Sequence, residues 1–352
     1  MPTLFDPIKI GDLELPNRIF MAPLTRCRAV DQRIPNELMV EYYAQRASAG
    51  LIFSEATSIS PMGVGYPDTP GIWSSEQVVG WKRITNRVHE QGGKMLSQLW
   101  HVGRISDPIY LNGVTPIAPS AIRPAGYVNQ VHPKKEFVTP RALDLGEIPG
   151  IIEEYRKAAI NAKEAGFDAV EIHSANGYLL DQFLQDSTNK RTDGLGGMIA
   201  NRARLLLRVV DAVISVWGKD RVGVHLAPRG DSNSMGDSNP RLLFGFVAQQ
   251  LGRRKIAFIC ARESIGPDRL GPELKKAFGG IYIANEGFTK ESAQAALDAG
   301  EADAFCFGKQ FLANPDLPER FANNAPLNTP DPATFYGSGK EGYTDYPSLV
   351  LK

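Results

Sequence analysis

The chain is poor in the residues and segments on which disulfide-bonded, metal-binding and membrane-spanning proteins depend. Its 352 residues include 3 cysteines and 5 histidines. Cys27, Cys260 and Cys306 are too scattered for a disulfide framework, and the histidines come from separate elements, so we expect free thiols and no metal. No apolar run reaches the roughly 18 residues of a membrane-spanning helix. The start, MPTLFD, lacks the basic and apolar regions of a signal peptide, so we expect a cytoplasmic protein.

An excess of charge of one sign and two catalytic motifs are also missing. Lys plus Arg (39) equals Asp plus Glu (39), so the chain has no basic field for nucleic acid or an anionic membrane. It has no GxGxxG after the first predicted strand, which argues against an open dinucleotide-binding sheet, and no GxSxG of a serine hydrolase. We expect a small-molecule substrate, no nucleic-acid or membrane partner, and a monomer or homodimer.

What is present is a regular alternation of short strands and helices. Eight apolar runs, rich in β-branched and aromatic residues, lie at Arg18–Leu24, Gly50–Thr57, Lys94–Val102, Phe167–His173, Arg221–Ala227, Ile256–Ala261, Gly280–Ala284 and Ala302–Phe307. Amphipathic stretches of helical length lie at Asn36–Ala49, Ser75–Gly92, Ile148–Ala165, Asn201–Trp217, Pro240–Gly252 and Thr289–Ala299. Eight strands alternating with helices predict an α/β fold, a closed TIM (β/α)₈ barrel, as a single domain over residues 1–352.

Three segments lie outside the eight units. Pro7–Leu15 alternates apolar and polar residues around Gly11-Asp12 and predicts an N-terminal β-hairpin that closes the barrel floor. Pro108–Leu145 is a long insertion after the third strand, and we expect it to form a lid over the top face. Thr334–Pro347 is rich in aromatic residues and glycine, and we expect it to pack across the barrel.

Alternation along each strand predicts which side chains point into the barrel. The apolar Val170 and Ile172 must face the helices, so Glu171 and His173 point inwards. By the same reasoning, the residues predicted to point inwards are Met21, Pro23 and Thr25 in the first strand, Gln98 and Trp100 in the third, and Gly223 and His225 in the fifth. Chemistry in such barrels takes place where the strands end, so the polar members of this set should line one cavity.

The densest polar string, His173-Ser-Ala-Asn176-Gly-Tyr178, directly follows the fourth strand. His173 and Asn176 can aim two donors at one acceptor, and Tyr178 adds a phenol that is protonated at neutral pH. Such a set suits a substrate whose carbonyl oxygen gains charge while a neighbouring carbon takes a proton. A polar turn that caps the next helix explains the same residues equally well.

The loops after strands seven and eight are where such barrels commonly hold phosphate. Here they read Asn285-Glu286-Gly287 and Gly308-Lys309. Backbone N–H groups at a helix start together with a lysine favour a phosphate monoester. Ordinary turns also use glycine and asparagine, so the motif alone leaves both readings open.

Together these strings resemble the old yellow enzyme family of FMN-dependent ene reductases, in particular bacterial members that act on enones and nitro compounds. The resemblance covers almost the whole chain. It is carried by NRIFMAPLTR (17–26), YYAQRASAGLIFSEAT (42–57), QLWHVGRI (98–105), GFDAVEIHSANGYLLDQFLQDSTNKR (166–191), ANPDL (313–317) and EGYTDYP (341–347).

The resemblance implies roles for individual residues. Non-covalent FMN would contact Pro23, Leu24, Thr25, Ala56, Gln98, His225, Asn285, Glu286, Gly287, Gly308 and Lys309. The catalytic residues would be His173, Asn176 and Tyr178, and the substrate pocket would include Tyr66, Trp100 and Tyr343. His173 and Asn176 would bind the activating oxygen of the substrate, and Tyr178 would donate the proton.

The implied activity is that of an NAD(P)H-dependent FMN oxidoreductase. Hydride would pass from NADPH, or NADH, to flavin N5 and then to the β-carbon of an α,β-unsaturated carbonyl compound, while Tyr178 protonates the α-carbon. The alternative is a reductase acting mainly on nitrate esters, nitroaromatics or quinones with the same site. A non-enzymatic flavin- or sugar-binding barrel is a third reading, against which the complete HxxNxY set argues.

One departure from the family pattern lies at strand five, where the family usually has an inward arginine facing flavin N1 and this chain has His225. Histidine is cationic only below about pH 6.5 unless its pKa is shifted, so we expect a lower or more pH-dependent flavin potential. Arg229 is a second candidate for the missing charge. Lys309 stands for the commoner arginine, which retains the charge but gives up bidentate phosphate binding.

Overall fold

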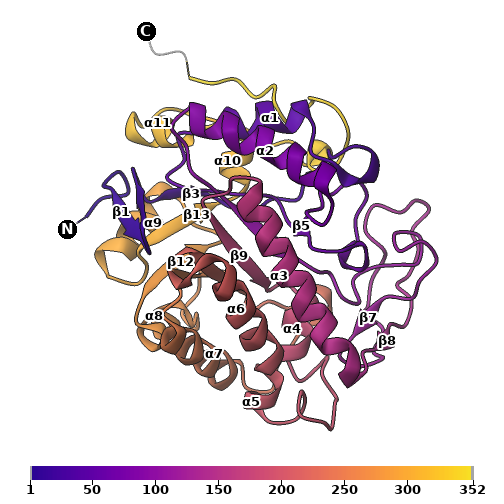
Figure 1. The fold of residues 1–352 in the computed structure, drawn as a ribbon. Coiled ribbons are helices and arrows are strands. Elements are labelled where there is room, and N and C mark those ends of the chain that lie inside the picture. Colours follow the sequence, from indigo (N-terminus) through magenta and orange to yellow (C-terminus); the bar gives the residue numbers. More distant parts are fainter. Residues whose placement is uncertain (1, 350–352) are drawn as a thin grey trace.

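Eight parallel strands close into a barrel in the computed structural model, which describes residues 2–349 (Figure 1). In ring order they are β3 (Ile19–Met21), β4 (Ile52–Phe53), β6 (Met95–Trp100), β9 (Ala169–Ser174), β10 (Val222–Leu226), β11 (Phe258–Arg262), β12 (Ile281–Asn285) and β13 (Ala304–Phe307). The pairing of β13 with β3 closes the ring. Strand β5 (Thr57–Ser58) follows β4 along the chain and pairs with the carboxyl end of β6, beyond the residues with which β4 pairs. The predicted barrel and all eight of its strands are confirmed.

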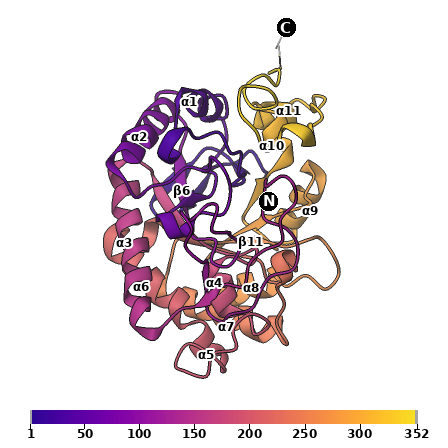
Figure 2. The same ribbon diagram turned by 90° about the vertical axis from the view of Figure 1, so that its right-hand side faces the viewer.

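Helices surround the barrel on the outside (Figure 2). Those that the periodicity predicted are α1 (Glu37–Ala44), α2 (Ser75–Glu90), α3 (Ile148–Glu164), α6 (Arg204–Trp217), α7 (Pro240–Arg254) and α9 (Lys290–Asp298). Five shorter helices were not predicted: α4 (Leu179–Leu184), α5 (Ile199–Arg202), α8 (Gly271–Phe278), α10 (Lys309–Ala313) and α11 (Leu317–Ala322). Four of them have 4 to 6 residues, which is too short to show the helical period, and α8, with 8 residues, opens on Gly-Pro.

Helix α2 illustrates how local sequence sets an element that supports the site. The Ser74 hydroxyl accepts from the Gln77 N–H, and the Gln77 side chain accepts from the Ser74 N–H, forming a capping box. The buried face of the helix carries Val78, Trp81 and Ile84, spaced three residues apart. This face packs in the apolar layer between helices and strands, which holds β6 in place.

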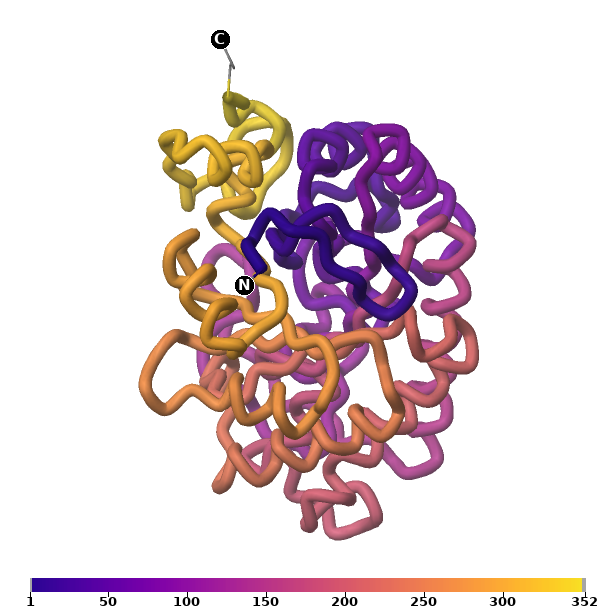
Figure 3. Tube along the Cα trace, turned by 90° about the vertical axis from the view of Figure 1, so that its left-hand side faces the viewer, coloured from indigo at the N-terminus to yellow at the C-terminus, as the bar shows by residue number. Residues whose placement is uncertain are grey.

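The N-terminal hairpin closes one end of the barrel, as predicted. Strands β1 (Ile8–Ile10) and β2 (Leu13–Leu15) pair antiparallel around Gly11, whose φ of 60° suits glycine. The apolar face of the hairpin joins one cluster with interior barrel residues such as Phe53 and Phe258. Figure 3 shows the hairpin, in indigo, lying across this end. The cavity therefore opens only toward the carboxyl ends of the strands.

The first barrel strand faces the opposite way from the prediction. Met21 belongs to the outer apolar cluster, whereas Phe20 and Ala22 belong to the interior cluster. Pro23 and Thr25 nevertheless line the cavity. They do so because the chain has already left the strand after Met21, and strict alternation does not hold in a loop.

The insertion at residues 108–145 packs behind the cavity wall and does not line the cavity itself. It carries the short parallel pair β7 (Ile117–Ala118) and β8 (Arg141–Ala142), and Figure 1 shows it at the end of the barrel opposite the N-terminal hairpin, toward which the strands point. Val128 and Phe137 pack in a cluster with Trp100 and Tyr178, while none of the residues 108–145 lines the cavity. The insertion therefore lies at the carboxyl end of the barrel and supports the cavity wall from behind, and its role as a lid stays a prediction.

The C-terminal tail packs against α1 and the loop after β3. Tyr343 is fully buried and stacks on Tyr42 with the ring centroids 4.0 Å apart. The predicted place of Tyr343 in the substrate pocket therefore does not match its position, and Phe335 and Tyr336 of the same tail line the cavity instead. Separately, the described part of the chain contains no helix with the length and apolarity to cross a membrane.

Candidate functional site

A cavity of about 670 Å³ lies at the carboxyl ends of the barrel strands. Its wall includes every residue that the sequence assigns to the cofactor: Pro23, Leu24, Thr25, Ala56, Gln98, His225, Asn285, Glu286, Gly287, Gly308 and Lys309. It also includes His173, Asn176, Tyr178, Tyr66 and Trp100. Of the predicted site residues, Tyr343 alone lies outside the wall. The structure thus brings side chains from all around the barrel to one space.

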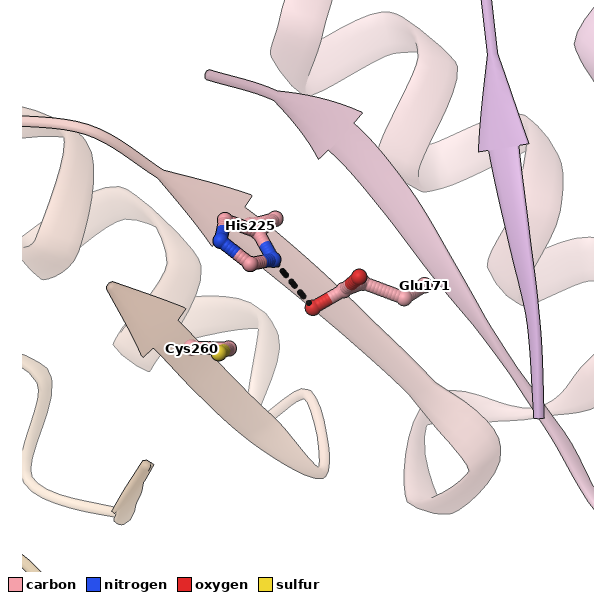
Figure 4. Close-up of side chains that lie close together, drawn as sticks. All are labelled: Glu171, His225 and Cys260. Atoms are coloured by element: carbon pink, nitrogen blue, oxygen red, sulfur yellow. Dashed lines mark hydrogen bonds and ion pairs between the residues drawn. The ribbon is translucent and has the colours of Figure 1, made fainter. Parts of the chain in front are cut away.

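Glu171 organises the inner end of this cavity. One of its carboxylate oxygens accepts from His225 Nδ1 at 3.0 Å, and the other accepts from Gln98 Nε2 at 2.7 Å. All three residues are buried and come from neighbouring strands β6, β9 and β10. Figure 4 shows the bond between Glu171 and His225. Because a carboxylate only accepts, Gln98 must turn its Nε2 toward Glu171, and its Oε1 is left as an acceptor.

The charge of His225 depends on two neighbours, Cys260 and Glu171. Burial by itself lowers the pKa of His225, but the neighbouring Cys260 and the Glu171 carboxylate raise it to about 10. His225 is therefore an imidazolium at neutral pH, with Nδ1–H on Glu171. Its Nε2 is buried without a hydrogen-bond partner among the described residues. A buried donor of this kind calls for an acceptor from a ligand.

Cys260 completes a compact group with these residues. The Cys260 thiol, His225 and Glu171 each place one potential metal-ligand atom within 4.8 Å of the others (Figure 4). Sequence spacing gave no hint of this cluster, since the three residues are on three strands. Glu171 already accepts hydrogen bonds from Gln98 and His225, and burial raises the pKa of the Cys260 thiol. A metal would have to displace both the Nδ1 proton and the thiol proton.

His173 lies at the end of β9, and its ring has a fixed polarity. The Ala175 N–H donates to His173 Nδ1 at 3.3 Å, so Nδ1 is the acceptor and the ring proton sits on Nε2. Burial, followed by the positive charges of His225 and Arg262, holds the pKa of His173 well below its usual value. At neutral pH His173 is therefore uncharged, and it can donate a hydrogen bond through Nε2.

Tyr178 faces the same space from the loop before α4. Its hydroxyl lies 3.0 Å from that of Tyr66, and its ring stands edge-on to those of Trp100 and His173. Burial raises the pKa of Tyr178 to about 12. The phenol therefore keeps its proton at neutral pH and can give it only to a strongly basic atom.

The outer end of the cavity is formed by the loops after β12 and β13. It contains Asn285, Gly287, Gly308 and the exposed Lys309. A Cβ built on Gly308 would lie only 3.4 Å from a methyl of Leu24, which indicates that the two loops approach closely there. Backbone N–H groups and one ammonium at this end suit a phosphate group.

The two ends of the cavity fit the two ends of FMN. At the inner end, the Gln98 acceptor and the His225 donor match the N3–H donor and the neighbouring C2 carbonyl of a flavin ring. At the outer end, Lys309 matches the phosphate. The unpartnered His225 Nε2 is the observation on which this fit depends.

Sequence reasoning missed several wall residues, of which Arg262 is the most polar. Its guanidinium enters the cavity beside Asn176. The alternation rule would have found it, because Cys260 and Arg262 are two apart and share the inward face of β11. Arg229, the other candidate for the missing charge, pairs with Glu263 and Asp268 and does not line this cavity.

Residues 3–328 match the model of the NADH:flavin oxidoreductase / NADH oxidase family. The chain is 43% identical to 12-oxophytodienoate reductase 1 of Oryza sativa subsp. japonica, covering 98% of this chain and 93% of that protein. It is also 43% identical to 12-oxophytodienoate reductase 2 of Arabidopsis thaliana, covering 98% and 96%.

Two solved structures superpose closely on the chain. The old yellow enzyme homologue from Zymomonas mobilis is 48% identical, with a TM-score of 0.97 over 99% of this chain and 100% of that one. Morphinone reductase in complex with tetrahydroNAD is 48% identical, with a TM-score of 0.96 over 99% of this chain and 98% of that one.

Proposed function

Because the chain belongs to the NADH:flavin oxidoreductase / NADH oxidase family, that of the old yellow enzymes, and is therefore a flavin-dependent NAD(P)H oxidoreductase, we propose that it is an FMN-dependent ene reductase. Its substrates would be α,β-unsaturated carbonyl compounds. The observation that carries the proposal is the convergence of three uncharged hydrogen-bond donors, His173, Asn176 and Tyr178, on one wall of the cavity.

Each of these groups has one part in the reaction. FMN, when bound and reduced by NADPH or NADH, supplies the hydride that reaches the substrate β-carbon. His173 Nε2 and the Asn176 amide donate to the carbonyl oxygen, which gains negative charge as the hydride arrives. Tyr178 gives its proton to the α-carbon, which is basic enough at that moment to take it.

At the inner end of the cavity, the chain's own residues tune the flavin. With FMN bound, the imidazolium of His225 would donate from Nε2 to the N1 and C2 carbonyl side of the ring, where reduction adds negative charge. Gln98 would accept from the ring N–H through Oε1. Glu171 holds both side chains in these orientations.

The comparisons support a carbonyl substrate. The relatives named 12-oxophytodienoate reductase and morphinone reductase both carry a ketone in the names of their substrates. The structure of morphinone reductase also contains a nicotinamide analogue, tetrahydroNAD. A nicotinamide and an unsaturated ketone would use one cavity in turn, so a ping-pong cycle is expected here.

The test is a two-step anaerobic experiment on the purified protein. The protein should be yellow, NADPH should bleach it under nitrogen, and 2-cyclohexenone should restore the oxidised flavin spectrum and yield cyclohexanone. Loss of colour without any reoxidation by enones would overturn the proposal. In competition with a nitrate ester, a strong preference for the nitrate ester in kcat/KM would instead favour the alternative reductase activity.

A further inference from the structure

Arg262 connects three loops at the mouth of the cavity. Its side chain leaves the end of β11, donates from Nη1 to Asn176 Oδ1 at 3.0 Å, and donates from Nη2 to Glu286 Oε1 at 2.8 Å. Asn176 lies in the loop after β9, and Glu286 in the loop after β12. The side chains of Arg262 and Glu286 are only 38% and 37% exposed, so the pair is partly shielded from water.

The bond to Asn176 decides which end of the amide faces the substrate. A guanidinium has five N–H donors and no acceptor, so it can hold the amide only by its oxygen. With Oδ1 on Arg262, the two N–H groups of Nδ2 are left for the cavity, and Nδ2 donates to none of the residues 2–349. A free amide could equally present its oxygen, which would repel a carbonyl oxygen.

The backbone of Asn176 is held independently of Arg262. Its carbonyl oxygen accepts from Asn233 Nδ2 at 2.7 Å, and the following Gly177 N–H donates to Asp181 at 2.9 Å. Asn176 itself adopts a φ of 57°, which asparagine tolerates. The turn thus fixes where the amide is, and Arg262 fixes how the amide is rotated.

Glu286 holds Arg262 in place at a conformational cost. It has a φ of 86°, a backbone conformation that residues with a side chain rarely adopt. Strain of this kind persists where surrounding contacts demand it, and the contact of the Glu286 side chain is the guanidinium of Arg262. If Arg262 were removed, the Glu286 carboxylate would become an acceptor for the Asn176 N–H groups and would draw them away from the cavity.

We propose that Arg262 is a positioning residue that orients the Asn176 amide so that its N–H groups face the substrate oxygen. The inference rests on the proposed function. It assigns to Arg262 the role that the Ala175 N–H has for His173: each of the two donors is kept in its donating form by a donor behind it. Arg262 acts through Asn176 and needs no contact with the substrate.

The test is a double-mutant cycle that combines Arg262→Met and Asn176→Ala in the FMN-loaded enzyme. The probe is cyclohexanone, which has the carbonyl oxygen but no double bond to reduce, and its Kd is read from the change in the flavin absorption spectrum. Arg262→Met alone should raise the Kd by up to roughly tenfold, the effect of losing one hydrogen bond to the ketone oxygen. In the Asn176→Ala background it should change the Kd less than about twofold.

Two further variants separate positioning from charge. Arg262→Lys, which can still donate to Oδ1, should give a Kd between those of the wild type and Arg262→Met. Arg229→Met removes a nearby guanidinium that touches neither Asn176 nor the cavity, so it should leave the Kd unchanged. An equal loss from Arg262→Met in both Asn176 backgrounds would overturn the proposal, and so would a wild-type flavin spectrum that cyclohexanone does not alter. Ketone binding without turnover of 2-cyclohexenone would contradict the proposed function alone.

Discussion

Glu171 accepts a hydrogen bond from His225 Nδ1 at 3.0 Å inside the barrel, and together with Cys260 it raises the pKa of a residue that is usually neutral, so that His225 is a buried cation. The sequence-based expectation was a flavin potential that changes between pH 6 and 8, near the ordinary pKa of histidine. With Glu171 and Cys260 raising the pKa of His225 to about 10, the change moves above that range. The position that has an arginine elsewhere in the family thus keeps a positive charge.

The flavin potential should reveal this charge. Between pH 6 and 8 the midpoint potentials of the wild type and of His225→Arg should run parallel, and they should diverge above pH 9 as the imidazolium loses its proton. Glu171→Gln should move the divergence to a lower pH, because one of the two groups that raise the pKa of His225 is gone. Spectroelectrochemical titration measures these curves. A wild-type curve that already breaks away between pH 6 and 8 would contradict the assigned charge.

The same pair should make the stability of the flavin-free protein depend on pH. The pKa of His225 rises from 6.5 to about 10 on folding, so its contribution is complete below pH 6.5 and is lost as the pH rises through 10. His225→Gln should therefore lower the free energy of unfolding by a few kcal/mol at pH 6, at about 1.4 kcal/mol per pKa unit, and by much less at pH 10. Urea denaturation at the two pH values tests this. A difference that does not change with pH would rule the pair out as its source.

Removal of the Tyr178 hydroxyl should affect one half of the catalytic cycle. Tyr178→Phe should slow the reoxidation of reduced enzyme by 2-cyclohexenone by roughly 10²-fold or more, because no proton reaches the α-carbon. Flavin reduction by NADPH should stay nearly unchanged. Stopped-flow absorbance follows both steps. Tyr66→Phe, which removes the hydroxyl 3.0 Å from that of Tyr178, is the matched control and should slow reoxidation much less. An equal fall in both half-reactions would contradict the role of Tyr178 as the proton donor.

The donor pair should matter for oxidation by enones more than for binding of the flavin. His173→Ala should lower the rate of enone reduction by roughly 10²–10³, since one of two donors to the developing oxyanion is lost. The FMN content should remain near one per chain. Because His173 is already neutral, its titration should not affect the rate between pH 6 and 8. The pH profiles of the wild type and of His173→Ala should therefore both lack a break near pH 6.5. Rapid-reaction kinetics over pH 6–8 measures both quantities.

Relief of the strain at Glu286 should be visible in stability. Glu286→Gly should have a free energy of unfolding about 1 kcal/mol higher than Glu286→Gln, because glycine tolerates a φ of 86° and glutamine does not. Both variants lose the ion pair with Arg262, so the comparison isolates the backbone. Denaturant titrations that give the two variants equal stability would show that the conformation carries no strain.

Most of the fold and of the site follows from local rules applied to the sequence. The alternation of residues along β6, β9 and β10 correctly placed Gln98, His173 and His225 around one cavity, because strict strands keep their period. The rule was wrong for Met21, at the point where β3 ends and a loop begins. Arg262 stands at the last position of β11, two residues after the inward Cys260, so the same alternation also directs it toward the cavity.

What the sequence could not give are relations between elements distant along the chain. The bond between Glu171 and His225 joins two strands, and the resulting rise in the pKa of His225 depends on its length and burial. The place of Tyr343 was wrong for the same reason. Its aromatic ring suited either a pocket or a stack, and only the path of the tail past Tyr42 decides between them.

The C-terminal tail, which borders the cavity, is held in place through its backbone carbonyl oxygens. Arg26 donates to the carbonyl oxygens of Phe335, Thr334 and Gly342, and Arg28 donates to those of Gly339 and Glu341. Every amino acid has such a carbonyl, so the side chains at positions 335 and 336 contribute to the cavity wall without being needed to anchor it. Substitutions at positions 335 and 336 should therefore change the shape of the cavity entrance while the tail keeps its course.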